Sequence, residues 1–188
     1  MSYDVSLSSE KWVANSGGIG TIAWTSANAV LTGGSAWVSL GSGQASNYFW
    51  ASSLGLSTPV NLSFDGVMIG ITGRADSNNS IQDSSVRLIQ NGTVSSVDST
   101  RTVAWGTANA RFVYGGSTQG WGFATWNSGL INNSNTSNGM GMLFAVSNIS
   151  AASATFYVTA VTEVNCHYSV TDLSVRPVSL TGIGVGRF

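Results

Sequence analysis

Apolar and polar residues alternate along much of the chain, which is the pattern that half-buried β-strands produce. In the longest run, 153–168, Phe156, Val158 and Cys166 fall on one face and His167 falls on the other. Windows with the spacing of an amphipathic helix are almost absent. We therefore predict an all-β chain with strands at 20–24, 35–41, 46–51, 66–74, 84–91, 100–104, 110–115, 120–124, 139–147 and 153–168.

Turn-forming residues separate these runs. The Asn-Gly pair in QNGT at 90–93 joins two strand-like runs and is typical of a tight β-hairpin. The segments 74–83 and 127–139 are rich in Asn and Ser and predict polar connections. By contrast, GMGMLFAV at 139–146 is apolar on both faces, so we expect a central or interface strand there.

The aromatic-rich segment RFVYGGSTQGWGFATW at 111–126 allows two interpretations. Its rings could form an exposed ligand platform, or they could face a core or an interface from a strand, a glycine loop and a second strand. Phe112 and Tyr114 alternate into the glycine pair, and Trp121 and Phe123 alternate out of the next glycine. This alternation favours core or interface aromatics.

The composition disfavours nucleic-acid and membrane partners. Charged residues make up only 8% of the chain, against roughly 25% in an ordinary globular protein, and the formal net charge is −1. The few arginines are dispersed, so no basic stripe forms and we expect no nucleic-acid partner. No run approaches the roughly 18 apolar residues of a membrane helix. The first residues lack the basic start and apolar run of a signal peptide, so we expect synthesis in the cytoplasm and no membrane association.

The sequence offers no cluster of reactive side chains. Cys166 is the single cysteine, which excludes an intramolecular disulfide and a Cys-rich zinc site. Glycoside hydrolysis needs two facing carboxylates, whereas the acids here are mostly single residues in turns. His167 is the single histidine, and no Gly-x-Ser-x-Gly motif accompanies it. We predict no enzymatic activity, no catalytic residue and no cofactor.

One polar stretch resembles a metal-binding loop. Residues 76–80 place Asp, Asn and Ser at alternate positions, as a calcium loop begins, but Ile81 takes the place of the sixth-position glycine and Arg87 that of the twelfth-position glutamate. This excludes an EF-hand and leaves an irregular calcium site as an alternative to our prediction of no metal. We expect Asp83 and Arg87 to form a local ion pair instead.

Several weak motifs follow one another in a characteristic order: WTSANA, GSAWVSLGSGQASNY, FDGVMIGITGRADSNNSIQDSSVRLIQNG, YGGSTQGWGFATW and GMGMLFAVSN before ATFYVTAVTEV. In order and spacing they resemble a recurring bacteriophage structural domain over roughly 22–168. The resemblance implies an antiparallel jelly-roll-like sandwich in a virion protein, without catalysis. Such domains occur on capsid surfaces, in head fibres and in tail components.

The ends of the chain lie outside the alternating block. We predict an N-terminal arm at 1–18, a jelly-roll-like β-sandwich at 19–168, and a C-terminal arm or edge strand at 169–188. An arm can add a strand to a neighbouring sheet edge, so we expect contact with another subunit or with the particle. The apolar residues proposed for that interface are Trp12, Val178, Leu180, Ile183 and Phe188.

These observations lead to an expected function. We expect a non-enzymatic virion protein, specifically a capsid decoration (cement) protein that binds the major capsid protein or other virion proteins as a dimer or trimer. The alternative is a carbohydrate-recognising module of a tail fibre or spike, in which one or two of the seven tryptophans would be exposed on a loop face. A polysaccharide-degrading enzyme is a third and weaker hypothesis.

Overall fold

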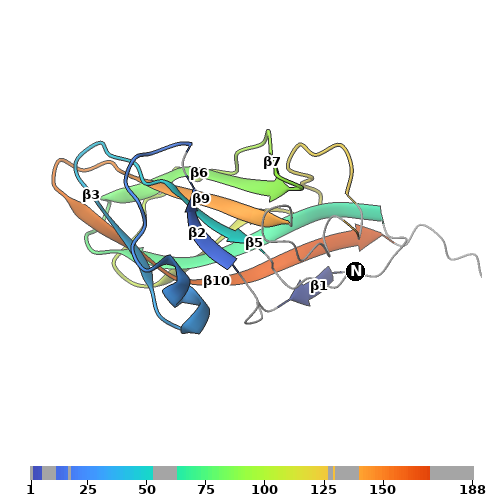
Figure 1. The fold of residues 1–188 in the computed structure, drawn as a ribbon, viewed down its shortest axis with the longest axis horizontal. Coiled ribbons are helices and arrows are strands. Elements are labelled where there is room, and N and C mark those ends of the chain that lie inside the picture. The colour runs from blue at the N-terminus through green and yellow to red at the C-terminus, as the bar shows by residue number, and fades with distance from the viewer. Residues whose placement is uncertain are drawn as a thin grey trace, which may run out of the picture.

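Two antiparallel sheets packed face to face make up the fold in the computed structural model, which describes residues 2–5, 12–16, 18–52, 63–126, 129 and 140–169 (Figure 1). This confirms the predicted all-β, jelly-roll-like antiparallel sandwich. Sheet A contains β1 (Ser2–Val5), β3 (Ala36–Leu40), β5 (Ser63–Ala75), β8 (Ala110–Gly115) and β10 (Ala154–Ser169). Sheet B contains β2 (Trp12–Ser16), β4 (Tyr48–Ser52), β6 (Ile81–Gln90), β7 (Thr93–Val94) and β9 (Gly141–Asn148), and a 3-10 helix, η1 (Ala27–Thr32), precedes β3.

The order of strands explains which segments are buried. Sheet A runs β1-β10-β5-β8, with β3 also paired to β10, and sheet B runs β2-β4-β9-β6-β7. The long strands β5 and β10 extend along most of the sandwich (Figure 1). The doubly apolar segment lies in β9, which sits between β4 and β6, so the predicted central strand is confirmed. Burial on both faces is what such a segment requires.

Aromatic rings fill the space between the sheets. Trp105 lies 4.8 Å from Phe156 of sheet A and 6.2 Å from Phe144 of sheet B, between ring centroids, and so bridges the two layers. Trp24 packs edge-on against Phe49 at 5.3 Å. Edge-to-face pairs of this kind stabilise a core beyond the area they bury. Trp24 and Trp105 are both buried in this core.

The tight hairpin and the register of the last strand are also as predicted. Asn91 and Gly92 between β6 and β7 have φ of 49° and 74°, as the hairpin turn favoured by Asn-Gly requires. In β10 the side chain of Cys166 is buried while that of His167 is half-buried. Burial raises the pKa of the Cys166 thiol to about 12.

The strand predicted at 100–104 is wrong. This stretch belongs to an irregular segment that follows the free edge of β6 and bonds to it only at intervals. Ser95, Ser99 and Trp105 donate their backbone N–H groups to Leu88, Val86 and Ile81 at 2.8–2.9 Å. Between these points, side chains such as Asp98 bond to nearby backbone instead, so no regular ladder forms.

The strands predicted at 20–24 and 120–124 are wrong as well. Ile22 forms only an isolated bridge with Ser46. Trp121 and Gly122 both have positive φ, 56° and 78°, which bends the chain into a turn and rules out an extended strand. The indole of Trp121 is nevertheless fully buried and donates to the Val67 carbonyl at 2.9 Å. The aromatic-rich segment is therefore a strand followed by a turn, with its key ring in the core.

The predicted N-terminal arm contributes a strand to each sheet of its own chain. β1 pairs with the C-terminal half of β10, and β2 pairs with β4. The sandwich thus begins before residue 19, because backbone hydrogen bonds tie both segments to sheet edges. The C-terminal arm lies outside the described residues from 170 onward.

A β-bulge in β6 decides which way its polar side chains point. The register with β9 shifts between Asp83 and Ser85, so the alternation of faces reverses there. Asp83 consequently faces the core, whereas Ser85 and Arg87 face outward. The predicted Asp83–Arg87 ion pair is therefore wrong, because the bulge puts the two residues on opposite faces. Arg87 pairs instead with Asp98.

Candidate functional site

A pocket of about 640 Å³ lies on the outer face of sheet B, the face turned away from sheet A. Aromatic, aliphatic and charged side chains converge around this pocket. Its walls come from the sheet itself, from the segment after β2, and from the hairpin and loop after β6. The lining residues are Gly18, Ile19, Tyr48, Trp50, Ser85, Arg87, Ile89, Val94, Ser95, Asp98 and Leu143.

The floor of the pocket is a single row across three strands. Leu143 in β9 lies opposite Trp50 in β4 on one side and opposite Arg87 in β6 on the other. Trp50 and Arg87 are half-buried, and Leu143 between them is buried. A flat aromatic face and a guanidinium therefore flank an apolar centre. Such a mixture is typical of small-molecule sites.

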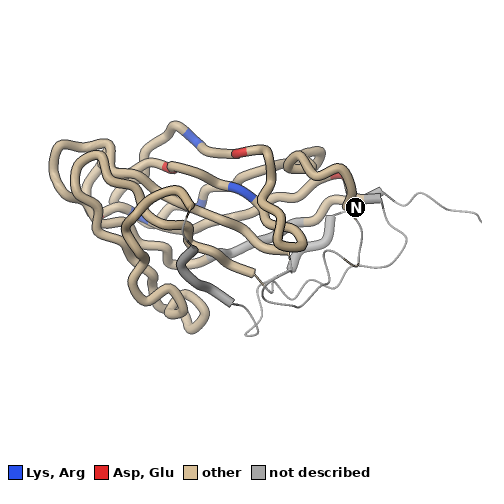
Figure 2. Tube along the Cα trace, turned by 45° about the horizontal axis from the view of Figure 1, so that its top comes forward, with Lys and Arg blue, Asp and Glu red and all other residues tan. Residues whose placement is uncertain are grey.

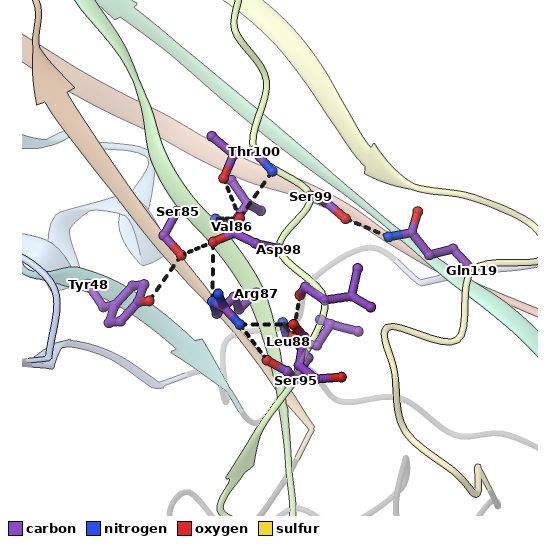
Figure 3. A network of polar contacts seen from close by, with 12 residues as sticks. Tyr48, Ser85, Val86, Arg87, Leu88, Ser95, Asp98, Ser99, Thr100 and Gln119 are labelled. Carbon is purple, nitrogen blue, oxygen red and sulfur yellow. Dashed lines mark hydrogen bonds and ion pairs between the residues drawn. The ribbon is translucent and has the colours of Figure 1, made fainter.

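A polar network anchored on Asp98 forms one wall (Figure 3). One carboxylate oxygen accepts from the backbone N–H of Val86 at 2.9 Å and from the backbone N–H and hydroxyl of Thr100. The other accepts from the Ser85 hydroxyl at 2.6 Å and pairs with Nε of Arg87 at 3.2 Å. These donors satisfy the carboxylate without help from a ligand.

The same contacts keep Asp98 ionised. Partial burial by itself raises the pKa of Asp98, but the hydrogen bonds from Ser85, Thr100 and Val86 outweigh it and hold the pKa below its usual value. Arg87 is fixed in turn, because its Nη1 also donates to the carbonyl of Ser95 at 2.8 Å. The Arg87–Asp98 pair is thus a rigid and internally neutral element of the wall.

The network also positions an aromatic ring. The Tyr48 hydroxyl lies 3.0 Å from the Ser85 hydroxyl, which itself donates to Asp98 (Figure 3). The ring of Tyr48 is held next to Trp50, two residues further along the same face of β4. Ile19 and Val94, 38% and 44% exposed, add an aliphatic rim. The pocket therefore has aromatic surface, hydroxyl groups and a fixed charge pair.

The residues predicted as interface residues do not build this site. Trp12 lies in β2, but its side chain is outside the described residues, as are the four C-terminal residues Val178, Leu180, Ile183 and Phe188. The described part of the chain therefore does not test the interface role predicted for these five residues. What the sequence analysis missed is the pair Tyr48 and Trp50. The motif YFWAS placed them two apart on a predicted strand, which was a usable signal for a shared face.

The carboxylate of Asp83, which faces the core, has a structural role. Asp83 accepts from the Trp105 indole at 2.8 Å and from the backbone N–H of Arg101 at 3.2 Å. Burial raises the pKa of Asp83, and the hydrogen bonds from the Trp105 indole and the Arg101 backbone oppose that rise only in part. Asp83 lies opposite Val146 in sheet B and is enclosed by aromatic rings, so no substrate reaches it in this structure.

The calcium-like stretch is the turn between β5 and β6. Asp76 accepts from the Ser77 hydroxyl, and the hydroxyl of Ser80 donates to the Ser77 carbonyl at 2.7 Å. Among the described residues, no three His, Cys, Asp or Glu side chains gather into a metal-binding group. Within the same part of the chain, no helix is long and apolar enough to cross a membrane.

Charged residues are thinly spread over the described chain (Figure 2), and one ion pair, Arg87–Asp98, lies in the wall of the pocket. No family model matches the chain, and no curated protein does. Among solved structures, one described as "CBM4 structure and function" superposes with a TM-score of 0.45 and 10% identity, over 84% of this chain and 95% of that chain. This likeness is too distant to say what the chain binds.

Proposed function

We propose that the chain is a non-enzymatic recognition module that binds a neutral saccharide in the pocket on sheet B. The observation that carries the proposal is the floor row Trp50–Leu143–Arg87, with the ring of Tyr48 beside it. Aromatic rings offer broad apolar faces that suit the apolar faces of sugar rings. Hydroxyl and guanidinium groups at the edge then fix orientation.

The charge pair favours a neutral ligand. Arg87 is compensated within the pocket by Asp98, and its Nη1 is already engaged by a backbone carbonyl. An anionic sugar would therefore meet an ionised carboxylate and no uncompensated cation, which costs binding free energy. The resemblance of the sequence to phage structural domains supports placing the module on a virion, as part of a tail fibre or spike.

A second candidate is the capsid decoration protein that the sequence suggested. The sparse charge of the surface favours it, because a charge-poor surface has weak colloidal protection and suits a chain largely covered by neighbours (Figure 2). Under this hypothesis, adding the protein to undecorated phage heads raises their resistance to heat by mass action. If the heads denature at the same temperature with and without the added protein, this candidate function is ruled out.

A glycan array tests the saccharide proposal. The full chain should bind neutral glycans saturably, and Trp50→Ala should weaken that binding about tenfold or more, since losing a central aromatic contact costs at least about 1.4 kcal/mol. Ile149→Ala is the matched control, because it truncates an exposed apolar side chain away from the pocket.

Circular dichroism of both variants checks that they fold. Tyr48→Phe provides a milder change, which keeps the ring and removes only the hydroxyl bonded to Ser85. It should weaken binding less than Trp50→Ala does. Absence of neutral-glycan binding by the unaltered chain, or equal binding by Trp50→Ala, contradicts the proposal.

A further inference from the structure

A second row of side chains crosses the outer face of sheet A, on the opposite side of the sandwich from the pocket. Trp37 of β3 lies opposite Tyr157 of β10, which lies opposite Arg74 of β5. The neighbours of Trp37 along β3 are buried, so its own side chain projects outward. It is 38% exposed, which leaves a large part of an indole in solvent.

The row is held rigidly. The backbone of Trp37 exchanges two hydrogen bonds with Thr25, of 2.8 and 3.1 Å, on the edge of β3 that faces away from β10. The guanidinium carbon of Arg74 lies 4.5 Å from the ring centroid of Tyr157, a cation–π contact. A guanidinium stacked on an aromatic ring keeps its in-plane N–H groups available for other acceptors. Arg74 forms no ion pair within the described part of the chain.

From this row we infer a second binding platform, which takes an acidic oligosaccharide: Trp37 stacks on one sugar ring and Arg74 binds the carboxylate of another. The two residues are separated by two strand spacings, about 9.5 Å. A short oligomer spans that distance and a single sugar does not. In the next row the hydroxyls of Ser39 and Thr155 lie 2.9 Å apart and offer polar contacts beside the indole.

The cation of this row selects an anionic ligand. The guanidinium of Arg74 has no ion-pair partner within the described part of the chain. The acid that follows Arg74 along the chain, Asp76, accepts a hydrogen bond from Ser77. The guanidinium of Arg74 therefore suits a carboxylate, which it can bind through two parallel hydrogen bonds.

A glycan fits this face better than a nucleic acid does. Nucleic-acid binding rests on neutralising many phosphates in a row, and the whole chain carries only seven Lys and Arg. An acidic oligosaccharide with its carboxylates on separate rings needs far fewer cations. The exposed indole then supplies contact area that does not depend on charge.

Calorimetric titration with hexagalacturonate and with its fully methyl-esterified form tests the inference, because the two share a backbone and differ in charge. The full chain should bind the acid form, and bind it more weakly as salt rises. Esterification, Trp37→Ala and Arg74→Gln should each lower affinity about tenfold or more. Arg74→Lys keeps the charge and loses the planar fork, so it should fall between Arg74→Gln and the unaltered chain.

Ile149→Ala, an exposed apolar truncation away from this row, should bind as the unaltered chain does. Failure to bind hexagalacturonate, equal binding of the ester, or unchanged affinity in folded Trp37→Ala overturns the inference. Equally tight binding of an oligothymidylate of matched charge overturns it too, since the face would then bind polyanions in general. The loss of neutral-hexaose binding in Trp50→Ala reports on the pocket, whereas the loss of hexagalacturonate binding on esterification and in Arg74→Gln reports on this row, so the inference and the proposed function can fail separately.

Discussion

Asp83 and Asp98 are two carboxylates with opposite environments. Asp83 faces the core below the bulge of β6, and burial raises its pKa. Asp98 lies at the wall of the pocket, where several donors overcome the effect of burial and lower its pKa. The first is a buried acceptor for Trp105, and the second is a fixed negative charge beside Arg87.

Removing the Asp83 carboxylate should destabilise the fold. Asp83→Ala leaves the buried Trp105 indole without its acceptor, which costs about 1–3 kcal/mol of unfolding free energy. Because the folded-state pKa of Asp83 is raised, its contribution is fully present below the unfolded pKa and is lost as pH rises through the folded pKa. Urea denaturation should therefore show a larger difference between the unaltered chain and Asp83→Ala at pH 4 than at pH 7.

The exposed Asp76→Ala is the control for this change and should alter stability by less than about 0.5 kcal/mol. A difference between the unaltered chain and Asp83→Ala that grows from pH 4 to pH 7 contradicts the burial of Asp83.

At the scale of elements, the turn after β8 depends on one glycine. Gly115 has a φ of 83°, and a Cβ there would collide with the Val67 carbonyl and approach the Trp121 ring to 2.8 Å. Gly115→Ala should therefore lower the unfolding free energy by about 2 kcal/mol or more. At the adjacent Gly116 a Cβ meets nothing within 4 Å, so Gly116→Ala should change it by less than about 0.5 kcal/mol.

Thermal or urea denaturation of this pair of variants measures the contrast directly. Equal stability of the two variants would mean that the turn does not approach β5 as the structure shows.

The alternation of apolar and polar residues predicted most strands, because the two-residue period of a half-buried strand can be read from neighbouring positions in the sequence. Segments 35–41, 110–115 and 153–168 match β3, β8 and β10 closely. The errors arose where a single residue changes the backbone. Trp121 with positive φ turns an apparently alternating stretch away from a strand, and the bulge in β6 reverses a face. Neither the positive φ of Trp121 nor the bulge in β6 can be recognised from the order of apolar and polar residues.

The candidate site was only partly predictable for a related reason. The spacing of Tyr48 and Trp50 placed them on one face of a strand from sequence alone. Which strands would flank them depends on the order β4-β9-β6, which joins residues far apart along the chain. The partner of Arg87 likewise comes from an irregular segment that no periodicity describes.

Over the whole molecule, the tryptophans divide by position. Trp24, Trp105 and Trp121 are buried in the core, whereas Trp50 and Trp37 lie on the outer faces of sheets B and A. The sandwich therefore presents two different aromatic faces on opposite sides. Each indole N–H gives its own NMR signal, so one spectrum can report on the core and on both faces.

The most direct test of the central proposal is an indole N–H titration of the full chain with the neutral hexaoses of glucose, mannose and galactose in turn. Trp50→Phe identifies the signal of Trp50 by its disappearance. We expect at least one hexaose to shift the Trp50 signal saturably while the signals of the buried Trp105 and Trp121 stay in place. If no hexaose moves the Trp50 signal, or if the shifts appear at other tryptophans and leave Trp50 unchanged, the pocket on sheet B is not a saccharide site.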